Sequence, residues 1–214
     1  MIFHLITNFS ELGGAESALI RLVNNSPAGK VKIISLMSCS DGMQKKITNE
    51  ECDIIAVGAT GALSLLLSSI KLLILIRKFR PARVYSWMYH ANAIAAISKM
   101  FSTTQFSLIW GVRHSLDDYE GEKISTKIAI KLGRVLRSFP SKVVYCSKNS
   151  CVQHEAIAYN SSSKSVYIPN GYEFGEFNRR SFSDRPIVLG AAGRFHPAKD
   201  HATLIGMALE LKKL

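Results

Sequence analysis

The sequence lacks the segments that carry a protein into or across a membrane. Its start, MIFHLITNF, has neither the basic residues nor the long apolar core of a signal peptide, and it is typical of a first β-strand. The most apolar stretch, residues 62–76, contains Lys71 and serines and falls short of the roughly 20 residues that span a bilayer. We therefore expect a helix there that packs in the core, with contact to a membrane surface as the less favoured alternative.

Cysteine is scarce and irregularly spaced. The four cysteines, Cys39, Cys52, Cys146 and Cys151, form no CxxC pair, which favours reduced thiols and a cytoplasmic location. Cys146, Cys151 and His154 are close enough in sequence for a metal site. However, Cys146 ends an apolar run, where a free cysteine acts as a small hydrophobic residue.

Acidic residues are outnumbered, with 16 Asp and Glu against 27 Lys and Arg and a net charge of +11. This excess favours a polyanionic partner: a nucleic acid, an acidic membrane face or a phosphorylated small molecule. The cations gather at expected strand ends and along one helix, without the interleaved aromatic residues of a nucleic-acid surface. We therefore expect no nucleic-acid partner.

Short apolar runs alternate with longer segments of helical period. This alternation predicts an α/β fold with a doubly wound parallel sheet and helices on both faces. The expected strands are residues 2–7, 30–37, 52–58, 83–87, 105–112, 142–147 and 165–170, and the expected helices are 14–25, 62–80, 90–101, 123–138 and 148–160. Ligands of such sheets gather beyond the carboxyl ends of the strands.

A polar, turn-rich stretch at residues 171–186 separates this domain, residues 1–170, from a second segment. Residues 187–214 predict one strand, 187–195, and one helix, 199–214. Because a single strand and helix cannot bury their own apolar faces, we interpret this segment as the start of a second domain. We expect Leu204, Ile205 and Leu209 to be exposed.

Two glycine-rich turns have the composition of phosphate sites. Gly13 and Gly14 stand before an expected helix start, where free N–H groups point outward. In GAAGRFHPAKDH, residues 190–201, Arg194 and Lys199 flank a similar turn. The alternative for Gly13 and Gly14 is that they only turn the chain.

Three further polar residues follow expected strands. His90 stands at a strand-to-helix turn, where it can exchange a proton or bind a hydroxyl or phosphate, or merely cap the helix. Arg113 and His114 leave the next strand, and an arginine fork suits phosphate or carboxylate. The alternative is an ordinary surface pair.

A charged loop and helix follow these residues. The carboxylates of residues 117–122 could bind a metal or serve as acid and base, but they are more typical of a solvated helix start. The helix carries a basic face, which we expect to be solvated, with contact to anionic lipid as the lesser alternative. That face consists of Lys123, Lys127, Lys131, Arg134 and Arg137, and the opposite face, expected to pack on the sheet, of Ile124, Ile128, Leu132 and Leu136.

Six motifs in order resemble the family-4 retaining glycosyltransferases of the GT-B fold, most of all bacterial enzymes of surface-polysaccharide biosynthesis. They are GGAES, SWMYHAN, WGVRHS, VVYCSKNSCVQHEAIAYN, VYIPNGYEFGEF and GAAGRFHPAKDHATLIGMALEL. Two positions depart from the family pattern: Ala158 stands where glycine is usual, and Glu173 where aspartate is common. We expect these departures to affect the geometry of a helix end and of the linker.

The resemblance implies two Rossmann-like domains, with a saccharide acceptor on the first and a UDP- or GDP-linked sugar donor on the second. It implies that Gly13, Gly14, Arg194 and Lys199 bind the donor diphosphate and that His90 lies by the sugar and acceptor. Arg113 and His114 would lie on the acceptor or sugar side. Fixed cations would stabilise the departing diphosphate, so no metal cofactor is expected.

The resemblance also implies a lipid-linked acceptor and a cytoplasmic protein at the inner face of a membrane. The family's donor half continues through further β-α units to a paired-glutamate motif that the sequence does not contain. The chain is therefore expected to be C-terminally truncated relative to the family. Two functions stay open: a hexosyltransferase-like enzyme, or a catalytically silent acceptor-binding or interaction module. The sugar, nucleotide and linkage are not specified by the sequence.

Overall fold

The computed structural model describes residues 1–27, 29–172, 188–193, 195 and 199–212. The chain divides into two compact units, Met1–Tyr172 and Glu173–Leu214. Most of the expected linker, residues 171–186, lies outside the described residues, so the linker stays a prediction.

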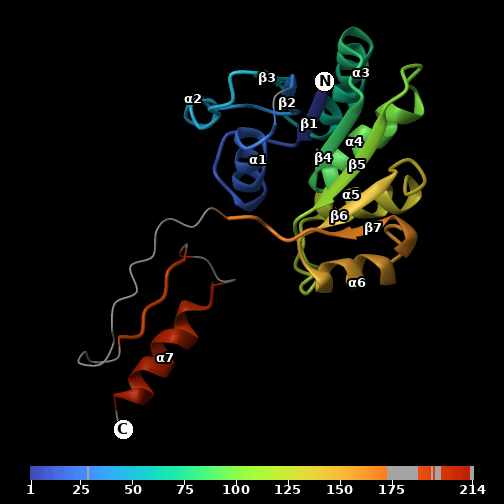
Figure 1. Ribbon diagram of the computed structural model, residues 1–214. Helices are drawn as coiled ribbons and strands as arrows, with labels where there is room; N and C mark the ends of the chain where they lie inside the picture. Colours follow the sequence, from blue (N-terminus) through green and yellow to red (C-terminus); the bar gives the residue numbers. More distant parts are fainter. Residues whose placement is uncertain (28, 173–187, 194, 196–198, 213–214) are drawn as a thin grey trace. The chain divides into compact units, whose positions relative to one another are not determined.

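The first unit is built on one sheet of seven parallel strands in the order β3-β2-β1-β4-β5-β6-β7 (Figure 1). The strands are β1 Ile2–Ile6, β2 Val31–Ser35, β3 Cys52–Ala56, β4 Arg83–Trp87, β5 Ser107–Val112, β6 Lys142–Tyr145 and β7 Ser165–Tyr167. The predicted doubly wound parallel sheet is therefore confirmed, with every strand of this unit where the apolar runs predicted it.

The helices cover both faces of the sheet. They are α1 Gly14–Asn24, α2 Asp41–Gln44, α3 Ala62–Phe79, α4 Met88–Met100, α5 Ile124–Val135 and α6 Lys148–Ala156, with a 3₁₀ turn at Ser162–Lys164. Residues of α1 and α2 share one core cluster with β1 and β2, while α3 to α6 share the other. The short helix α2, which Ser40 caps through its side chain, was not predicted.

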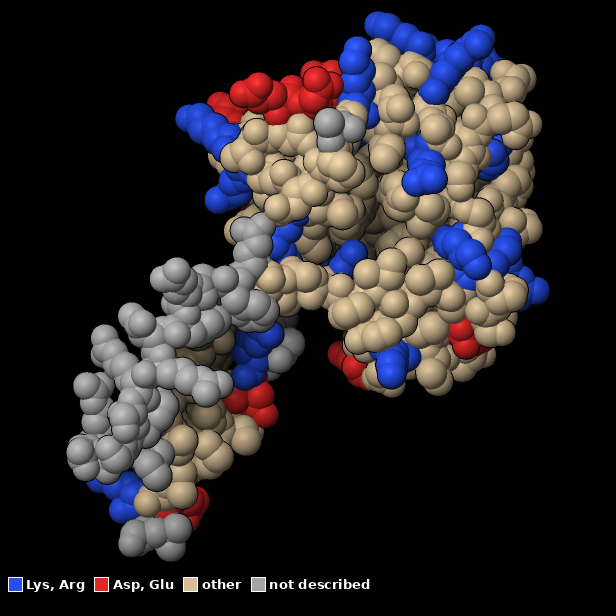
Figure 2. Space-filling model, in the orientation of Figure 1, with Lys and Arg blue, Asp and Glu red and all other residues tan. Residues whose placement is uncertain are grey.

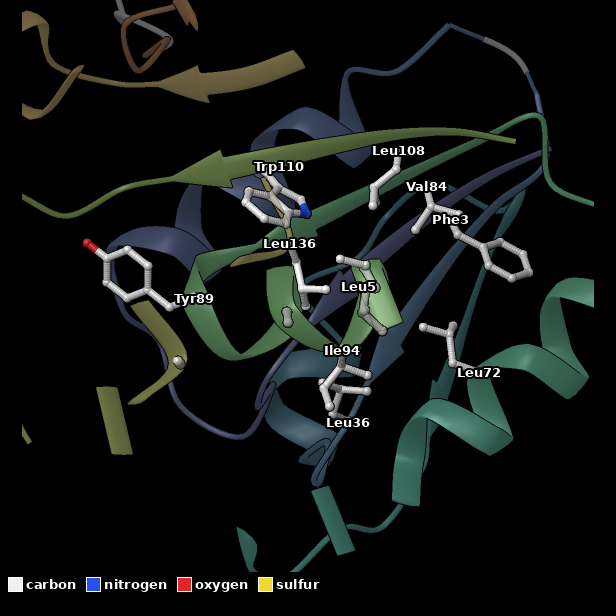
Figure 3. Packing of buried hydrophobic residues seen from close by; sticks show 14 of the residues in the cluster. Phe3, Leu5, Leu36, Leu72, Val84, Tyr89, Ile94, Leu108, Trp110 and Leu136 are labelled. Atoms are coloured by element: carbon white, nitrogen blue, oxygen red, sulfur yellow. The ribbon is translucent and has the colours of Figure 1, made fainter. Parts of the chain in front are cut away.

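The larger cluster forms the core between the sheet and α3 to α6. Figure 3 shows Leu72 of α3 and Ile94 of α4 beside strand residues such as Leu5. Trp110 of β5 is fully buried in the same cluster. Burying a large apolar side chain contributes on the order of 1.5–3 kcal/mol, so this layer fixes α4 firmly against the sheet.

Helix α5 buries only part of the face that the sequence predicts. Ile124 and Ile128, expected against the sheet, are 77 % and 59 % exposed. The helix instead buries small residues such as Ala129 and Gly133, and a Cβ at Gly133 would stand 2.4 Å from the Tyr159 ring. The other two residues of the predicted face pack as expected, since Leu136 is buried and Leu132 packs against the larger core cluster. The prediction is therefore wrong for Ile124 and Ile128 and confirmed for Leu132 and Leu136.

Helix α3 forms where the apolar stretch predicted it, but only one of its faces is buried. Leu72 and Ile76 are fully buried, whereas Ile70 and Ile74 are more than half exposed. None of the helices in the described ranges combines the length and the apolar character needed to cross a bilayer.

In the second unit, α7 spans His201–Leu211 and is capped by the side chain of Asp200. Leu204, Ile205 and Leu209 are 37 %, 60 % and 58 % exposed, which confirms the prediction for them. The strand expected at residues 187–195 is wrong for the described part, since residues 188–193 and 195 form no strand. An isolated strand has no neighbour to satisfy its N–H and C=O groups.

Figure 2 shows the Lys and Arg side chains of the first unit in separate patches on the face in view. The absence of a nucleic-acid partner stays a prediction.

Of the two positions that depart from the pattern of the resembled family, Glu173 lies outside the described residues. The other, Ala158, follows the C-cap of α6 in the left-handed region, with φ +56°. The turn lets the N–H of Tyr159 donate to the carbonyl of His154 at 2.9 Å and directs the fully buried Tyr159 ring inward. Glycine adopts this conformation without the Cβ clash that an L-residue meets.

Replacing Ala158 by glycine should raise the free energy of unfolding by about 0.5–1 kcal/mol, because relief of the clash exceeds the added entropy of the unfolded chain. Urea denaturation followed by circular dichroism measures the change. The matched control is Ala156→Gly at the end of α6, which should lower stability by about 0.5 kcal/mol. A destabilised Ala158→Gly variant would contradict the argument.

Candidate functional site

The order of the strands reverses between β1 and β4, which are neighbours in the sheet. From β1 the chain proceeds toward β2 and β3, and from β4 it proceeds toward β5, β6 and β7. In doubly wound sheets, ligands bind in the crevice outside the carboxyl ends at such a reversal. The turn with Gly13 and Gly14 follows β1, and His90 lies in the first turn of α4 after β4. The fold thus brings these predicted residues to one edge.

Gly13 is the N-cap of α1, and Gly14 is the first residue of this helix. A Cβ at Gly13 would lie 2.5 Å from Oε2 of Glu16, whereas the space around Gly14 is open. The Glu16 carboxylate therefore folds back over the helix start, where a negative charge is stabilised. A phosphate at this position would have to displace Glu16, and the predicted diphosphate role of the two glycines stays a prediction.

A cavity of about 140 Å³ opens beside the start of α4. It is lined by Met88, Tyr89, His90, His114, Glu122 and Thr126. Two histidines predicted separately from the sequence, His90 and His114, thus face one space. Burial lowers the pKa of His90, partly offset by a hydrogen bond with the backbone of Ser125. At neutral pH His90 is uncharged and can donate one hydrogen bond and accept another.

His114 is held from two sides. Its Nε2 lies 2.5 Å from Oε1 of Glu122, and its carbonyl accepts a hydrogen bond from the hydroxyl of Ser150 at 2.5 Å. The carboxylate loop of residues 117–122 therefore contributes Glu122 to the cavity wall.

The other carboxylates of this loop stabilise the loop itself. Asp118 accepts the N–H of Gly121 at 3.0 Å, and Glu120 lies 3.3 Å from Nζ of Lys127. Asp117 accepts hydrogen bonds from Ser115 and Gln153, which lower the pKa of its carboxyl. Among the described residues, no three His, Cys, Asp or Glu side chains gather closely enough to hold a metal ion.

A buried network supports the back of the cavity. Tyr89 donates its hydroxyl hydrogen to Nε2 of His154 at 2.8 Å, because Nδ1 of His154 donates to the carbonyl of Ser150 at 2.7 Å. Burial lowers the pKa of His154 to about 4. Both ring nitrogens are engaged, so His154 is a structural residue that orients Tyr89.

Met88 is a site residue that the sequence did not reveal. It follows β4 directly and has φ +71°, a strained value for a residue with a side chain. Its sulfur accepts the backbone N–H of Arg113 at 3.4 Å, which joins the ends of β4 and β5. Methionine has no preference for this conformation, so nothing in the local sequence predicted it.

Arg113 is not among the residues that line the cavity beside His114. Its Cζ lies 4.9 Å from the centroid of the Trp87 ring, and Nη1 donates to Oδ1 of Asn170 in the segment after β7. Asn170 was not predicted as a site residue, although the motif IPNG contained it.

The second predicted phosphate turn belongs to the second unit. Arg194 lies outside the described residues, and Lys199 belongs to the second unit. Their predicted roles at the donor diphosphate stay predictions.

Comparison with known proteins shows which solved structures share this fold. No family model matches the chain, and neither does any curated protein sequence. Among solved structures, the chain is similar to the apo form of the lipopolysaccharide outer core galactosyltransferase WaaB, with a TM-score of 0.65 and 16 % identity over 87 % of this chain and 50 % of that one.

Two further structures share the fold. A UDP-N-acetylglucosamine 2-epimerase from Rickettsia bellii matches with a TM-score of 0.56 and 11 % identity, over 79 % of this chain and 44 % of that one. A glycosyltransferase from Rickettsia africae ESF-5 matches with a TM-score of 0.51 and 17 % identity, over 78 % and 42 %. The chain thus spans half or less of the length of these structures, and its Rossmann-like fold is one that GT-B glycosyltransferases and related epimerases share.

Proposed function

We propose that this chain is the acceptor side of a glycosyltransferase that transfers a sugar from a nucleotide sugar to a saccharide acceptor in polysaccharide biosynthesis. The observation that carries the proposal is the cavity containing His90 and His114 at the carboxyl edge, beside the strand-order reversal. The fold shared with the galactosyltransferase WaaB supports it. The ordered motifs extend the proposal to a retaining enzyme of family 4.

In this proposal His90 binds a hydroxyl of the sugar or acceptor as a neutral imidazole. The donor is a UDP- or GDP-linked sugar, and negative charge grows on its diphosphate as the glycosyl bond breaks. Arg194 and Lys199 bind that diphosphate, with Gly13 and Gly14 near it, and stabilise the transition state more than the ground state. A diphosphate oxygen accepts the proton of the acceptor hydroxyl, so the reaction needs neither a protein base nor a metal.

A second candidate is an acceptor-binding or interaction module without catalysis of its own. The cavity lined by His90 and His114 supports it, since a saccharide can bind there without transfer. The described part of the second unit contains one helix, α7, with exposed apolar residues.

We also propose that the acceptor is lipid-linked and that the protein works at the inner face of a membrane. The outer side of α3 presents a stripe of large apolar side chains, each between 49 % and 72 % exposed: Leu63, Leu66, Leu67, Ile70 and Ile74. One helical turn further on, the same side continues into Arg77 and Lys78, both exposed. Apolar residues flanked by cations suit an anionic lipid surface.

Transfer is tested by incubating the purified chain with UDP- and GDP-sugars and lipid-linked saccharides in detergent. The enzyme proposal expects a glycosylated product whose new bond keeps the anomeric configuration of the donor, measured by NMR. His90→Gln should lower kcat/KM by about 100-fold, while Lys131→Gln on the exposed side of α5 should leave it unchanged. Saccharide binding without transfer favours the second candidate, and the loss of both binding and transfer contradicts the two together.

The membrane proposal is tested by sedimentation with vesicles. The chain should bind vesicles containing phosphatidylglycerol and bind pure phosphatidylcholine at least about tenfold more weakly. Replacing Leu66 and Ile70 together by glutamine should remove most of the binding. The control is Val152→Gln on α6, which is 65 % exposed in the native chain. An equal loss of vesicle binding in the α3 variant and the control argues against α3 as the membrane surface. Equal binding to charged and neutral vesicles argues against it as well.

A further inference from the structure

Two arginines from distant parts of the chain meet the same short segment after β7. Arg113 follows β5 and donates through Nη1 to Oδ1 of Asn170. Arg21 lies in the last turn of α1, with its Cζ 4.7 Å from the centroid of the Tyr172 ring. Because Asn170 and Tyr172 are two positions apart, the two guanidinium groups lie along one stretch of backbone.

The guanidinium of Arg113 is poorly satisfied in the folded chain. Among the described residues its Nε is buried without a hydrogen-bond partner, and the two groups that the guanidinium contacts, the Trp87 ring and the Asn170 amide, carry no charge. Burial lowers the pKa of Arg113; the nearby Cys146 opposes this shift, and the positive charge of Arg21 adds to it. Within residues 1–27 and 29–172, neither arginine is ion-paired with a carboxylate.

The surface beneath Arg113 is held rigidly. The indole N–H of Trp87 donates to Nδ1 of His4 at 3.3 Å, and the His4 ring stacks on Tyr85 with centroids 5.3 Å apart. The backbone N–H of Arg113 is fixed by Met88, as described above. The arginine is therefore presented on a preorganised support, which lowers the entropy lost when a ligand binds.

A half-buried guanidinium without a counterion is costly, and a second like charge beside it adds to the cost. An anion offsets both effects, and the planar fork of arginine matches carboxylate and phosphate oxygens. A neutral saccharide offers no such compensation.

We propose that Arg21 and Arg113 form a subsite for an anionic group of the acceptor, a carboxylate or phosphate borne by the saccharide. The inference rests on the proposed function. It adds that the saccharide acceptor carries an anionic group. Arg113 and His114 are consecutive at the end of β5: His114 lines the cavity, and Arg113 contacts Trp87 and Asn170. One acceptor can therefore reach the cavity through a hydroxyl and the arginines through its anionic group.

Calorimetry on the full chain at low salt tests the subsite, with glucuronate, galactose 6-phosphate, glucose and UDP as probes. One of the two anionic sugars should bind at least about tenfold more tightly than glucose. Arg21→Gln and Arg113→Gln should each weaken that binding by about tenfold, and Arg134→Gln, which removes an exposed charge from α5, should not. Arg113→Lys keeps the charge without the fork and should also bind weakly, while circular dichroism confirms that each variant folds.

Three results would overturn the inference: equal binding of glucose and the anionic sugars, equal binding by Arg134→Gln and the two subsite variants, or UDP binding that needs the same arginines and excludes the sugars. Failure of the proposed glycosyltransferase function can be told apart from failure of the subsite. Arginine-dependent binding of an anionic sugar without any transfer leaves the subsite standing. If Arg21→Gln and Arg113→Gln both retain transfer to neutral acceptors, the transferase proposal is supported and the subsite is contradicted.

Discussion

The reversal of strand order between β1 and β4 is the constraint on which the candidate site depends. Each strand of a parallel sheet must be connected by a crossover, and a right-handed crossover places its helix on the face set by the direction of travel along the sheet. Helix α1 therefore covers one face and α3 to α6 cover the other. The chain leaves β1 and β4 toward opposite faces, and the cavity beside the start of α4 is lined by residues that follow β4 and β5.

The polar residues around this crevice are fixed by interactions that reach back into the core. Tyr89 is oriented by the buried His154, and Trp87 is oriented by His4. The strained backbone of Met88 brings the end of β4 to the end of β5. A buried hydrogen bond that is satisfied on both sides restricts a side chain to one position. The residues that face the cavity and those that face the arginines are therefore held before any ligand arrives.

Much of the fold followed from the sequence because Val- and Ile-rich runs and turn residues mark parallel strands clearly. His90 and His114 were identified because they follow strands, and strand ends in a parallel sheet share one edge. The sequence patterns did not predict which residues are buried where tertiary packing, and not the spacing of apolar residues, determines burial. In α5, Ile124 and Ile128 are exposed, whereas Gly133 packs where the Tyr159 ring leaves no room for a Cβ. Met88, Arg21 and Asn170 depend on contacts between residues far apart in the chain, which local patterns do not encode.

The central claim is that the carboxyl edge of the sheet, between β4, β5 and the segment after β7, is where the acceptor binds. Amide hydrogen exchange of the full chain, with and without a lipid-linked saccharide, tests this claim most directly. The account predicts slower exchange at residues 88–90, 113–116 and 170–172, with unchanged exchange at the amino ends of the same strands. Protection confined to the amino edge, or to the outer side of α5, would contradict it.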